Sequence, residues 1–414
     1  MTAMADPKII DLIRAEEEKD GWTSLEFFPP KSAEGVKNLT KRMERMKVTK
    51  PLFTDVTWGA GGSTADLSTT IAKTMRDVGY VANLHMTCTN MGDDIDPITA
   101  IKNALDEAKD AGIRNIVALR GDPPHGQDEW TAAEGGFTCA LDLVKFMRKN
   151  YGDEFGISVA GYPEGHSKAI TQLTEEEANN MTAAEKGRCS MRDGVTYVCK
   201  DEDYEKELIY LKEKVDAGSD FIMTQMFFDT AVYGTFVKDC RARGITCPIV
   251  PGLMCINAYR GFMNMTKFCR TRVPESLLAK MEEIKDDVDA VKAFGVSFGI
   301  QMCKDILSYN DTKGLHFYTL NLEKVVYGIL DGLGITNSAS KKTDESDAKS
   351  MQAVGSAWAR VGDNIKTSYG GLGTVTDIRE DGTTVVLLDK WDLANGQRPT
   401  LYLRPNAYTK VMAA

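Results

Sequence analysis

The chain has 414 residues and a formal net charge of −10 at pH 7, from 60 acidic and 50 basic side chains. This acidic balance argues against nucleic acid or a membrane surface as a partner, because both carry negative charge. The length exceeds that of a usual single domain and suits one large barrel with a small additional module. No apolar run approaches the length of a membrane span, and the N-terminus lacks the pattern of a signal or transit peptide.

Cysteine and histidine spacing narrows the classes further. The nine cysteines occur singly, without a C-x-x-C pair, which is typical of reduced thiols, so we expect a cytoplasmic protein. The four histidines are His85, His125, His166 and His316. They form no H-x-H or H-E-x-x-H pattern, so the sequence predicts no metal site.

In chain order, a first helix is predicted over residues 7–18, and β-rich runs then alternate with amphipathic helices. The predicted strands cover residues 22–28, 52–57, 81–87, 115–120, 157–161, 221–227, 248–251 and 315–320. The predicted helices cover residues 35–46, 66–78, 97–111, 138–151, 205–217, 231–243, a helix-rich region 259–308, and 321–330. Eight strand–helix units favour an α/β fold, the (β/α)8 TIM barrel. A doubly wound sheet is the alternative, but its usual G-x-G-x-x-G turn does not occur.

Two segments depart from this alternation. An insertion at about 167–204 follows the fifth strand and contains Asp193-Gly194, which predicts a hairpin turn; it is either a lid or interface piece, or a surface excursion. Beyond the barrel, residues 336–350 have the composition of a linker. Residues 351–414 contain strand runs, two of them joined by Asp381-Gly382, and predict a small separate β-rich module with an interaction or dimer-stabilising role. The predicted domains are therefore a barrel over 1–335, the linker and this module.

The stretch SLEFFPP places one carboxylate, Glu26, near the end of the first strand. Alternation puts Leu25 and Phe27 on one face of this strand and Ser24, Glu26 and Phe28 on the other. A carboxyl group on the inner face would be desolvated, and its pKa would rise toward the range useful for proton donation. A plainer alternative is an acid that caps the loop after an edge strand.

Other polar and aromatic residues follow the predicted strand ends, where TIM barrels carry their chemistry. Singly, each has a plain structural explanation: Thr57 as a strand threonine, His85 as a core histidine, Asp122 as a turn residue before prolines. Together they would line one face of the barrel with acids, an amide, aromatic rings and glycines. That composition suits a planar heteroaromatic cofactor with a second planar ligand stacked on it.

The chain resembles the methylenetetrahydrofolate reductase family, in its eukaryotic branch, through ordered motifs between about residues 20 and 335. The motifs are SLEFFPP, FTDVTWGAGGST, LHMTC, ALRGDPP, VAGYPEGH, DAGSDFIMTQMFFD, VPGLMC and LHFYTLN. The resemblance implies a (β/α)8 barrel that binds FAD. It also implies reduction of 5,10-methylenetetrahydrofolate to 5-methyltetrahydrofolate by NADPH or NADH, with NADPH favoured, in a ping-pong hydride transfer.

The resemblance also implies roles for single residues. Glu26 matches the general acid that opens the imidazolidine ring of the substrate. Asp122 matches a catalytic aspartate near the flavin pyrimidine ring and the pterin, where it would tune the flavin and stabilise a cationic iminium. Gln225 matches the pterin-binding glutamine, and Phe228 an aromatic that packs near substrate or nicotinamide. Flavin-contacting positions are matched by Thr57, His85, Arg120, Gly121, Asp122, Ala160, Tyr162, His166, Glu207 and Lys214.

Some residues depart from the family pattern. Leu322 stands where many members carry an arginine near the folate tail. The C-terminal piece does not resemble the regulatory domain of animal and fungal members, so no inhibition by S-adenosylmethionine is expected. A homo-oligomer is expected, with a dimer favoured.

Two other functions stay open on the sequence. One is a different FAD-dependent barrel, such as a proline dehydrogenase, against which the pairing of EFFPP with RGDPP speaks. The other is a non-catalytic protein that binds flavin or folate for regulation. The joint presence of Glu26, Asp122 and Gln225 argues against this second alternative.

Overall fold

The structure, a computed structural model, describes residues 5–16, 21–58, 65–88, 95–121, 134–309, 311–335, 361–367, 372–378, 384–388, 400–403 and 408–410. Its largest sheet is parallel and has the strand order β10-β9-β5-β4-β3-β2-β1-β12-β11. The strands are β1 (Trp22–Phe27), β2 (Thr54–Val56), β3 (Ala82–Thr87), β4 (Asn115–Leu119), β5 (Gly156–Gly161), β9 (Phe221–Thr224), β10 (Ile249–Val250), β11 (Gly252–Met254) and β12 (Gly314–Tyr318).

The sheet closes where β10 and β11 follow each other across Pro251. β10 pairs with β9, and β11 pairs with β12, so both are parts of one barrel strand. Sequence analysis predicted one strand over 248–251, which covers β10, but the prediction ended too early and missed the continuation of the strand in β11. Proline has no N–H to donate, so the ladder changes partner at Pro251, whose carbonyl accepts the His316 N–H at 3.0 Å. The Gly252 N–H meanwhile donates to Thr224 Oγ1 at 3.0 Å. When β10 and β11 are counted as one strand, the barrel has the predicted (β/α)8 architecture.

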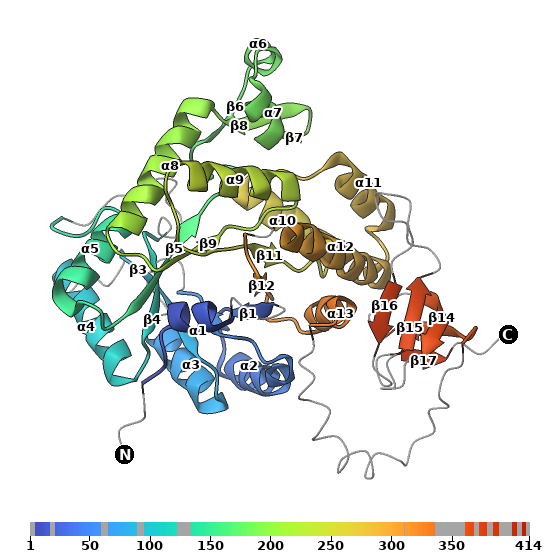
Figure 1. Ribbon diagram of the computed structural model, residues 1–414, viewed down its shortest axis with the longest axis horizontal. Coiled ribbons are helices and arrows are strands. Elements are labelled where there is room, and N and C mark those ends of the chain that lie inside the picture. Colours follow the sequence, from blue (N-terminus) through green and yellow to red (C-terminus); the bar gives the residue numbers. More distant parts are fainter. Residues whose placement is uncertain are drawn as a thin grey trace.

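Helices surround this barrel (Figure 1). They are α1 (Ile9–Glu16), α2 (Ala33–Met46), α3 (Ala65–Val78), α4 (Pro97–Asp110), α5 (Ala140–Tyr151), α8 (Asp201–Asp216), α9 (Thr230–Ala242), α10 (Tyr259–Cys269), α11 (Glu275–Ile284), α12 (Val288–Ser308) and α13 (Lys324–Leu333). In the described part of the chain, none of the helices is long and apolar enough to span a bilayer.

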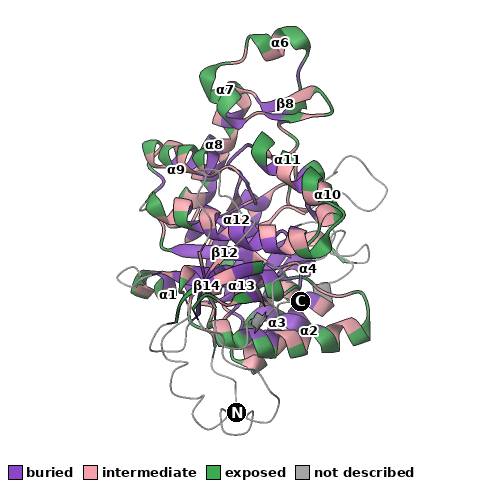
Figure 2. Cartoon of the chain, turned by 90° about the vertical axis from the view of Figure 1, so that its right-hand side faces the viewer, coloured by how far each residue is buried: buried purple, intermediate pink, exposed green. Residues whose placement is uncertain are grey.

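Strand alternation decides which side chains face the helices. Leu25 and Phe27 are fully buried and belong to the main hydrophobic cluster together with Leu39 and Met43 of α2. Figure 2 shows that the buried residues concentrate in the barrel while the outer helix faces are exposed. Intervening residues such as Ser24 point into the barrel, where its Oγ lies 2.8 Å from His316 Nδ1. The predicted faces of the first strand are therefore confirmed for Ser24, Leu25 and Phe27, whereas Phe28 lies beyond the end of β1 and is 42% exposed.

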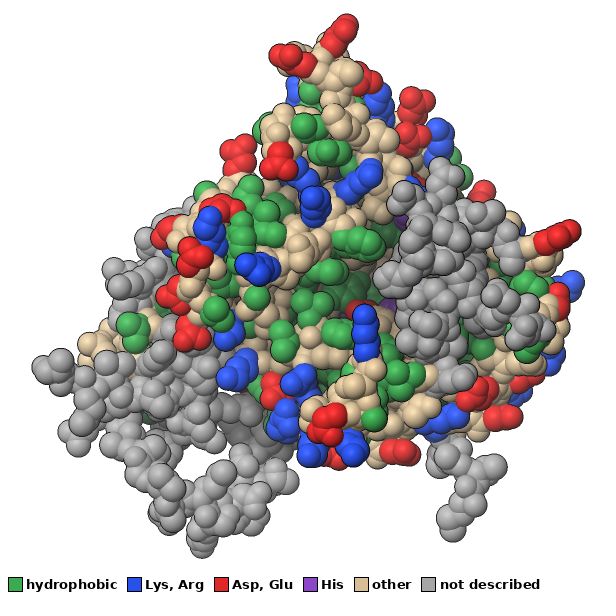
Figure 3. All heavy atoms as spheres, turned by 180° about the vertical axis from the view of Figure 1, so that it is seen from behind, with side chains coloured by type: hydrophobic (Ala, Val, Ile, Leu, Met, Phe, Trp, Pro, Cys, Tyr) green, Lys and Arg blue, Asp and Glu red, His purple; other side chains and the backbone are tan. Residues whose placement is uncertain are grey.

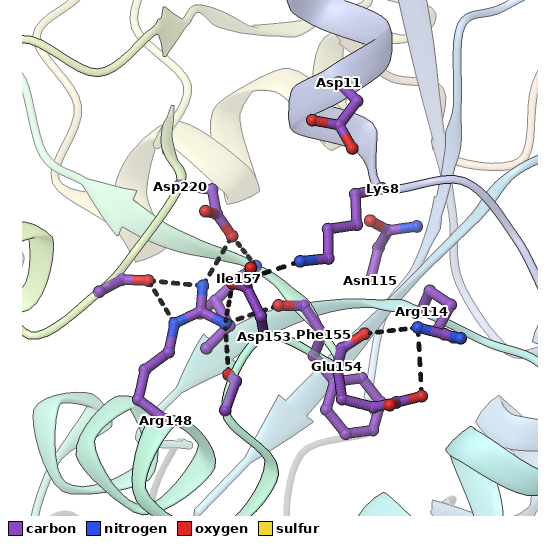
Figure 4. A network of polar contacts seen from close by, with 12 residues as sticks. Lys8, Asp11, Arg114, Asn115, Arg148, Asp153, Glu154, Phe155, Ile157 and Asp220 are labelled. Carbon is purple, nitrogen blue, oxygen red and sulfur yellow. Dashed lines mark hydrogen bonds and ion pairs between the residues drawn. The ribbon is translucent and has the colours of Figure 1, made fainter.

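At the N-terminal ends of the strands, a polar network around Arg148 of α5 holds neighbouring segments together (Figure 4). Its guanidinium donates to Asp220 Oδ2 at 2.8 Å and to the carbonyls of Phe155 and Gly218 at 2.7 Å each. Asp220 in turn accepts the Ile157 N–H at 2.7 Å. These bonds tie α5 to the starts of β5 and β9, on the face opposite to the predicted chemistry.

The insertion after β5 forms a small layer of its own, at the top of Figure 1. It contains β6 (Ile170–Gln172), α6 (Glu175–Asn179), α7 (Ala183–Arg188), β7 (Ser190–Arg192) and β8 (Val195–Cys199). β7 and β8 pair antiparallel across Asp193-Gly194, both with positive φ, so the predicted hairpin is confirmed. Arginines fasten the layer to the barrel: Arg192 donates to the Thr271 carbonyl at 2.6 Å, and Arg272 donates to the Cys189 carbonyl at 2.7 Å.

An antiparallel sheet of order β16-β15-β14-β13-β17 follows the barrel, as the predicted β-rich module requires. Its strands are β13 (Asn364–Thr367), β14 (Leu372–Ile378), β15 (Thr384–Leu388), β16 (Thr400–Leu403) and β17 (Tyr408–Lys410). The sheet is not separate from the barrel, because Leu401 and Val386 share one hydrophobic cluster with Ile300 of α12 and Ile329 of α13. The predicted linker 336–350 and the predicted turn at Asp381-Gly382 lie outside the described residues.

Candidate functional site

The C-terminal ends of the barrel strands, called the mouth below, bring together most of the described residues that sequence analysis singled out. Glu26 lies next to last in β1, paired with Asp55 of β2 on one side and Tyr318 of β12 on the other. Its side chain is only 16% exposed. Figure 3 shows one face of the molecule with a hollow that hydrophobic side chains surround and in which acidic and histidine side chains are visible.

Two carboxyl groups, those of Glu26 and Asp55, face the same imidazole, that of His85. His85 Nε2, from β3, lies 3.5 Å from Glu26 Oε2 and 3.1 Å from Asp55 Oδ2. Asp55 is fully buried, and its Oδ2 also accepts Asn83 Nδ2 at 3.2 Å. The facing atoms of Glu26, Asp55 and His85 all lie within 4.8 Å of one another. We call these three residues the acid cluster.

Two members of this cluster, Glu26 and His85, have raised pKa values. Burial raises the pKa of Glu26 to about 7, with the His85 charge opposing the rise and the Asp55 charge adding to it. Burial alone would lower the pKa of His85, but the Asp55 hydrogen bond and the two carboxylate charges raise it on balance. A carboxyl group with such a pKa is protonated in a large fraction of molecules near pH 7, as a general acid requires.

Asp55 is a site residue that sequence analysis missed. Within the motif FTDVTWGAGGST, sequence analysis assigned a role to Thr57 alone. The missed signal was an acid inside a short apolar strand, two residues before Thr57 and therefore on the same face. Thr57 itself lies beside the end of β1, because its N–H donates to the Phe27 carbonyl at 3.0 Å.

A second group of charged residues gathers around the end of β5. Lys214 of α8 is 3% exposed and donates through Nζ to the Ala160 carbonyl at 2.8 Å. Burial lowers its pKa to about 8, although the charge of Glu207 works in the opposite direction. Burial likewise raises the pKa of Glu207, against the opposing charges of Lys214 and Arg120. Ala160, Tyr162, Glu207 and Lys214 line one pocket.

His166 joins this second group. Its ring meets the Tyr162 ring edge to face, with centroids 4.8 Å apart. Burial lowers the pKa of His166 to about 4, and the positive charges of Arg120, Lys168 and Lys214 lower it further. The imidazole is therefore neutral near pH 7 and lies in a region of positive potential at this side of the mouth. We call Arg120, Lys214 and His166 the positive group, after the charges of the arginine and the lysine; His166 itself is neutral.

Gln225 and Phe228, the residues predicted to bind substrate, differ from each other in their surroundings. Gln225 follows β9, and its Oε1 accepts the Met226 N–H at 2.8 Å. Phe228 is 3% exposed and packs edge to face on Phe262, with centroids 5.1 Å apart. Its predicted contact with substrate or nicotinamide stays a prediction. Gly121 ends the described segment after β4 with a φ of 103°, and Asp122 lies outside the described residues.

Comparison with known proteins identifies the family. Residues 11–334 match the family model described as methylenetetrahydrofolate reductase. A rice (Oryza sativa subsp. japonica) relative named "Probable methylenetetrahydrofolate reductase (NADH)" is 51% identical over 331 residues, which cover 79% of this chain and 51% of the relative. "Methylenetetrahydrofolate reductase (NADH) 1" of Arabidopsis thaliana is 48% identical, with coverages of 80% and 52%.

A bacterial relative covers a different share of its own length. "5,10-methylenetetrahydrofolate reductase" of Pectobacterium carotovorum is 32% identical over 315 residues, which are 75% of this chain and 90% of that protein. The chain thus spans about half the length of the plant relatives and most of the length of the bacterial one. The family model and these identities argue against the alternative that the chain is a proline dehydrogenase. The chain belongs to the methylenetetrahydrofolate reductase family.

Proposed function

We propose that this barrel reduces 5,10-methylenetetrahydrofolate to 5-methyltetrahydrofolate at the expense of a reduced nicotinamide. The observation that carries the proposal is the carboxyl group of Glu26, buried at the mouth with a pKa of about 7. Ring opening of the substrate needs a proton on the departing imidazolidine nitrogen, and a neutral carboxyl group can donate it. The family to which the chain belongs supports the same assignment.

In this proposal the residues of the chain handle the proton, and the hydride comes from a cofactor. Glu26 donates its proton to the departing nitrogen, the ring opens to an iminium, and the iminium carbon accepts a hydride and becomes the methyl group. The amide of Gln225 would bind the pterin edge with its donor and acceptor atoms. Phe228 is proposed to shape the apolar wall beside the ligand, from its position in the buried cluster with Phe262.

We propose FAD as the hydride-transferring cofactor. The positive group fits a diphosphate, since the charges of Arg120 and Lys214 favour an anion and the neutral His166 can donate a hydrogen bond to it. Glu207, which lines the same small pocket as Lys214, is the proposed contact of a ribose hydroxyl. When bound there, FAD would supply two-electron chemistry between nicotinamide and folate, and Thr57, His85, Gly121, Ala160 and Tyr162 are the remaining proposed contacts.

For the donor we propose NADH, in place of the NADPH favoured by sequence alone. The plant relatives at 51% and 48% identity carry NADH in their names, whereas a Caenorhabditis elegans relative at 35% identity carries NADPH. We also propose that the chain forms a homodimer in solution. Light scattering of the purified chain tests this.

Asp122 keeps its proposed role beside the flavin and the pterin. Its carboxylate would oppose negative charge on the reduced cofactor and favour the cationic iminium. Asp122→Asn is expected to raise the flavin potential and to slow folate reduction. A potentiometric titration of wild type and variant tests this, and equal potentials would contradict the role.

The proposed function is tested with purified protein incubated with FAD. A bound flavin spectrum, anaerobic bleaching by NADH faster than by NADPH, and recovery of the oxidised spectrum on addition of methylenetetrahydrofolate are expected. Protein that binds FAD but transfers no electrons to the folate would be a non-catalytic binding protein, and protein that stays colourless would refute the cofactor assignment as well.

A further inference from the structure

Asp55 is a buried carboxylate that the proposed chemistry does not yet use. It is 0% exposed, and its Oδ2 lies 3.1 Å from His85 Nε2 and 3.2 Å from Asn83 Nδ2. Its Oδ1 is buried and has no hydrogen-bond partner among the described residues. A buried charge is costly unless it is paired, so a carboxylate with this few partners at the centre of the mouth points to a role there.

The geometry connects Asp55 to Glu26 through one ring nitrogen. His85 Nε2 faces both carboxyl groups, at 3.1 Å from Asp55 and 3.5 Å from Glu26. β1, β2 and β3 are adjacent, with Asp55 in register with both Glu26 and Asn83, so the backbone itself sets this arrangement. A hydrogen on Nε2 points toward the two carboxyl groups, and the shorter distance to Asp55 makes that group its main acceptor.

We propose that Asp55 is a positioning residue whose buried negative charge keeps one mobile proton on the Glu26–His85 pair, so that a proton stays available to Glu26 at a higher pH than it would without Asp55. The inference rests on the proposed function and extends it. A negative charge beside two protonatable groups tightens proton binding to both, whichever of them holds the proton. The last proton of the pair therefore leaves at a higher pH than it would without Asp55.

The neighbouring titratable groups do not supply this charge. Among the described residues, His316 and Tyr318 of β12 interact electrostatically with the cluster. Burial lowers the pKa of His316 to about 4 and raises that of Tyr318 well above its ordinary value, so both are neutral near pH 7. Within the described part of the barrel, Asp55 is thus the charged group against which the Glu26–His85 proton is balanced.

The test compares wild type with Asp55→Asn, which keeps the side-chain size and removes the charge. The His85 ring is titrated by NMR in protein without substrate and assigned with His85→Gln. In wild type, His85 is expected to titrate above pH 6.5, and in Asp55→Asn about one pH unit lower or more, a roughly tenfold loss of proton affinity. The alkaline limb of the folate half-reaction should move down by a similar amount, while the pH profile of the nicotinamide half-reaction stays in place.

Ser24→Ala is the matched control, because Ser24 also points into the barrel but contacts His316 instead of His85. It should leave the His85 titration and the alkaline limb unchanged. A folded Asp55→Asn protein with both readouts within about 0.3 unit of wild type would overturn the inference. If Asp55→Asn does not fold, a wild-type His85 that titrates below pH 6.5 would overturn it alone. Absence of folate-dependent reoxidation in wild type would instead refute the proposed function.

Discussion

Glu26 and His85 have raised pKa values for different physical reasons. For Glu26 the cause is burial, which disfavours the carboxylate. For His85 burial acts in the opposite direction, and the neighbouring carboxylates outweigh it. The two groups thus compete for one proton near pH 7, and their titrations are those of a coupled pair. Such a pair suits an acid that must be neutral before each proton transfer.

The shift of Glu26 also predicts a pH-dependent stability. Because its pKa of about 7 in the folded protein exceeds the ordinary 4.5, the stability linked to this group is fully present below pH 4.5 and is lost as the pH rises through 7. Glu26→Gln removes this loss. We expect the variant to be more stable than wild type at pH 8 by roughly 1–3 kcal/mol, and the difference to vanish near pH 4. Urea unfolding at both pH values measures it; a difference independent of pH would argue against a buried, titrating carboxyl group.

At the scale of elements, the two ends of the barrel have separate tasks. The mouth carries the acid cluster and the positive group, whereas Arg148 and Asp220 join α5, β5 and β9 at the other end. This division is usual for TIM barrels, in which one face carries function and the other carries stability. Changes at the Arg148 end should therefore affect folding more than chemistry.

Arg148→Met tests this division. The variant keeps much of the apolar stem but removes the hydrogen bonds that the guanidinium donates to Asp220 and to the carbonyls of Phe155 and Gly218. We expect a loss of about 3 kcal/mol of unfolding free energy with a kcat within twofold of wild type. Arg14→Met is the matched control, because Arg14 is 66% exposed and lies 3.7 Å from Asp11, so it should cost less than about 0.5 kcal/mol. Equal effects of the two variants would contradict the account.

The sequence of the insertion contains local signals for a turn and for two short helices, but sequence analysis used only the turn signal. The Asp193-Gly194 turn was predicted because a two-residue hairpin demands such residues. α6 and α7 were missed, although Thr174 with Glu177 and Thr182 with Glu185 form capping boxes that have a clear sequence signature. The anchoring of this layer by Arg192 and Arg272 could not be predicted, since both donate to backbone carbonyls distant in sequence.

For the whole molecule, periodicity sufficed to predict the barrel and most of its elements. It could not locate the division at Pro251, because that depends on which neighbour each half finds when the sheet closes. Nor could it show that Asp55, His85 and Glu26 meet, since three neighbouring strands contribute one residue each. The residue roles that the family resemblance implies remain predictions. The structure adds Asp55, which contacts His85 and which the resemblance did not name.

The C-terminal sheet forms part of the same packed core as the barrel. Leu401 of β16 is 2% exposed and lies beside Gly332 of α13, where an added Cβ would be 3.7 Å from the leucine Cδ2. Leu401→Ala should cost roughly 2–4 kcal/mol and lower the midpoint of a single unfolding transition. Leu372→Ala on β14, where the side chain is 43% exposed, is the control and should be nearly neutral. Two separate transitions in the thermal scan would show that sheet and barrel unfold independently.

The central claim is that Glu26 donates the proton that opens the folate ring, and stopped-flow measurement of the two half-reactions of Glu26→Gln tests it most directly. Flavin reduction by nicotinamide needs no such proton, so we expect its rate to stay within about threefold of wild type. Flavin reoxidation by methylenetetrahydrofolate should fall at least about 100-fold, the lower range for loss of a general acid. Equal losses in both half-reactions, or a folate half-reaction that proceeds at the wild-type rate, would contradict the account.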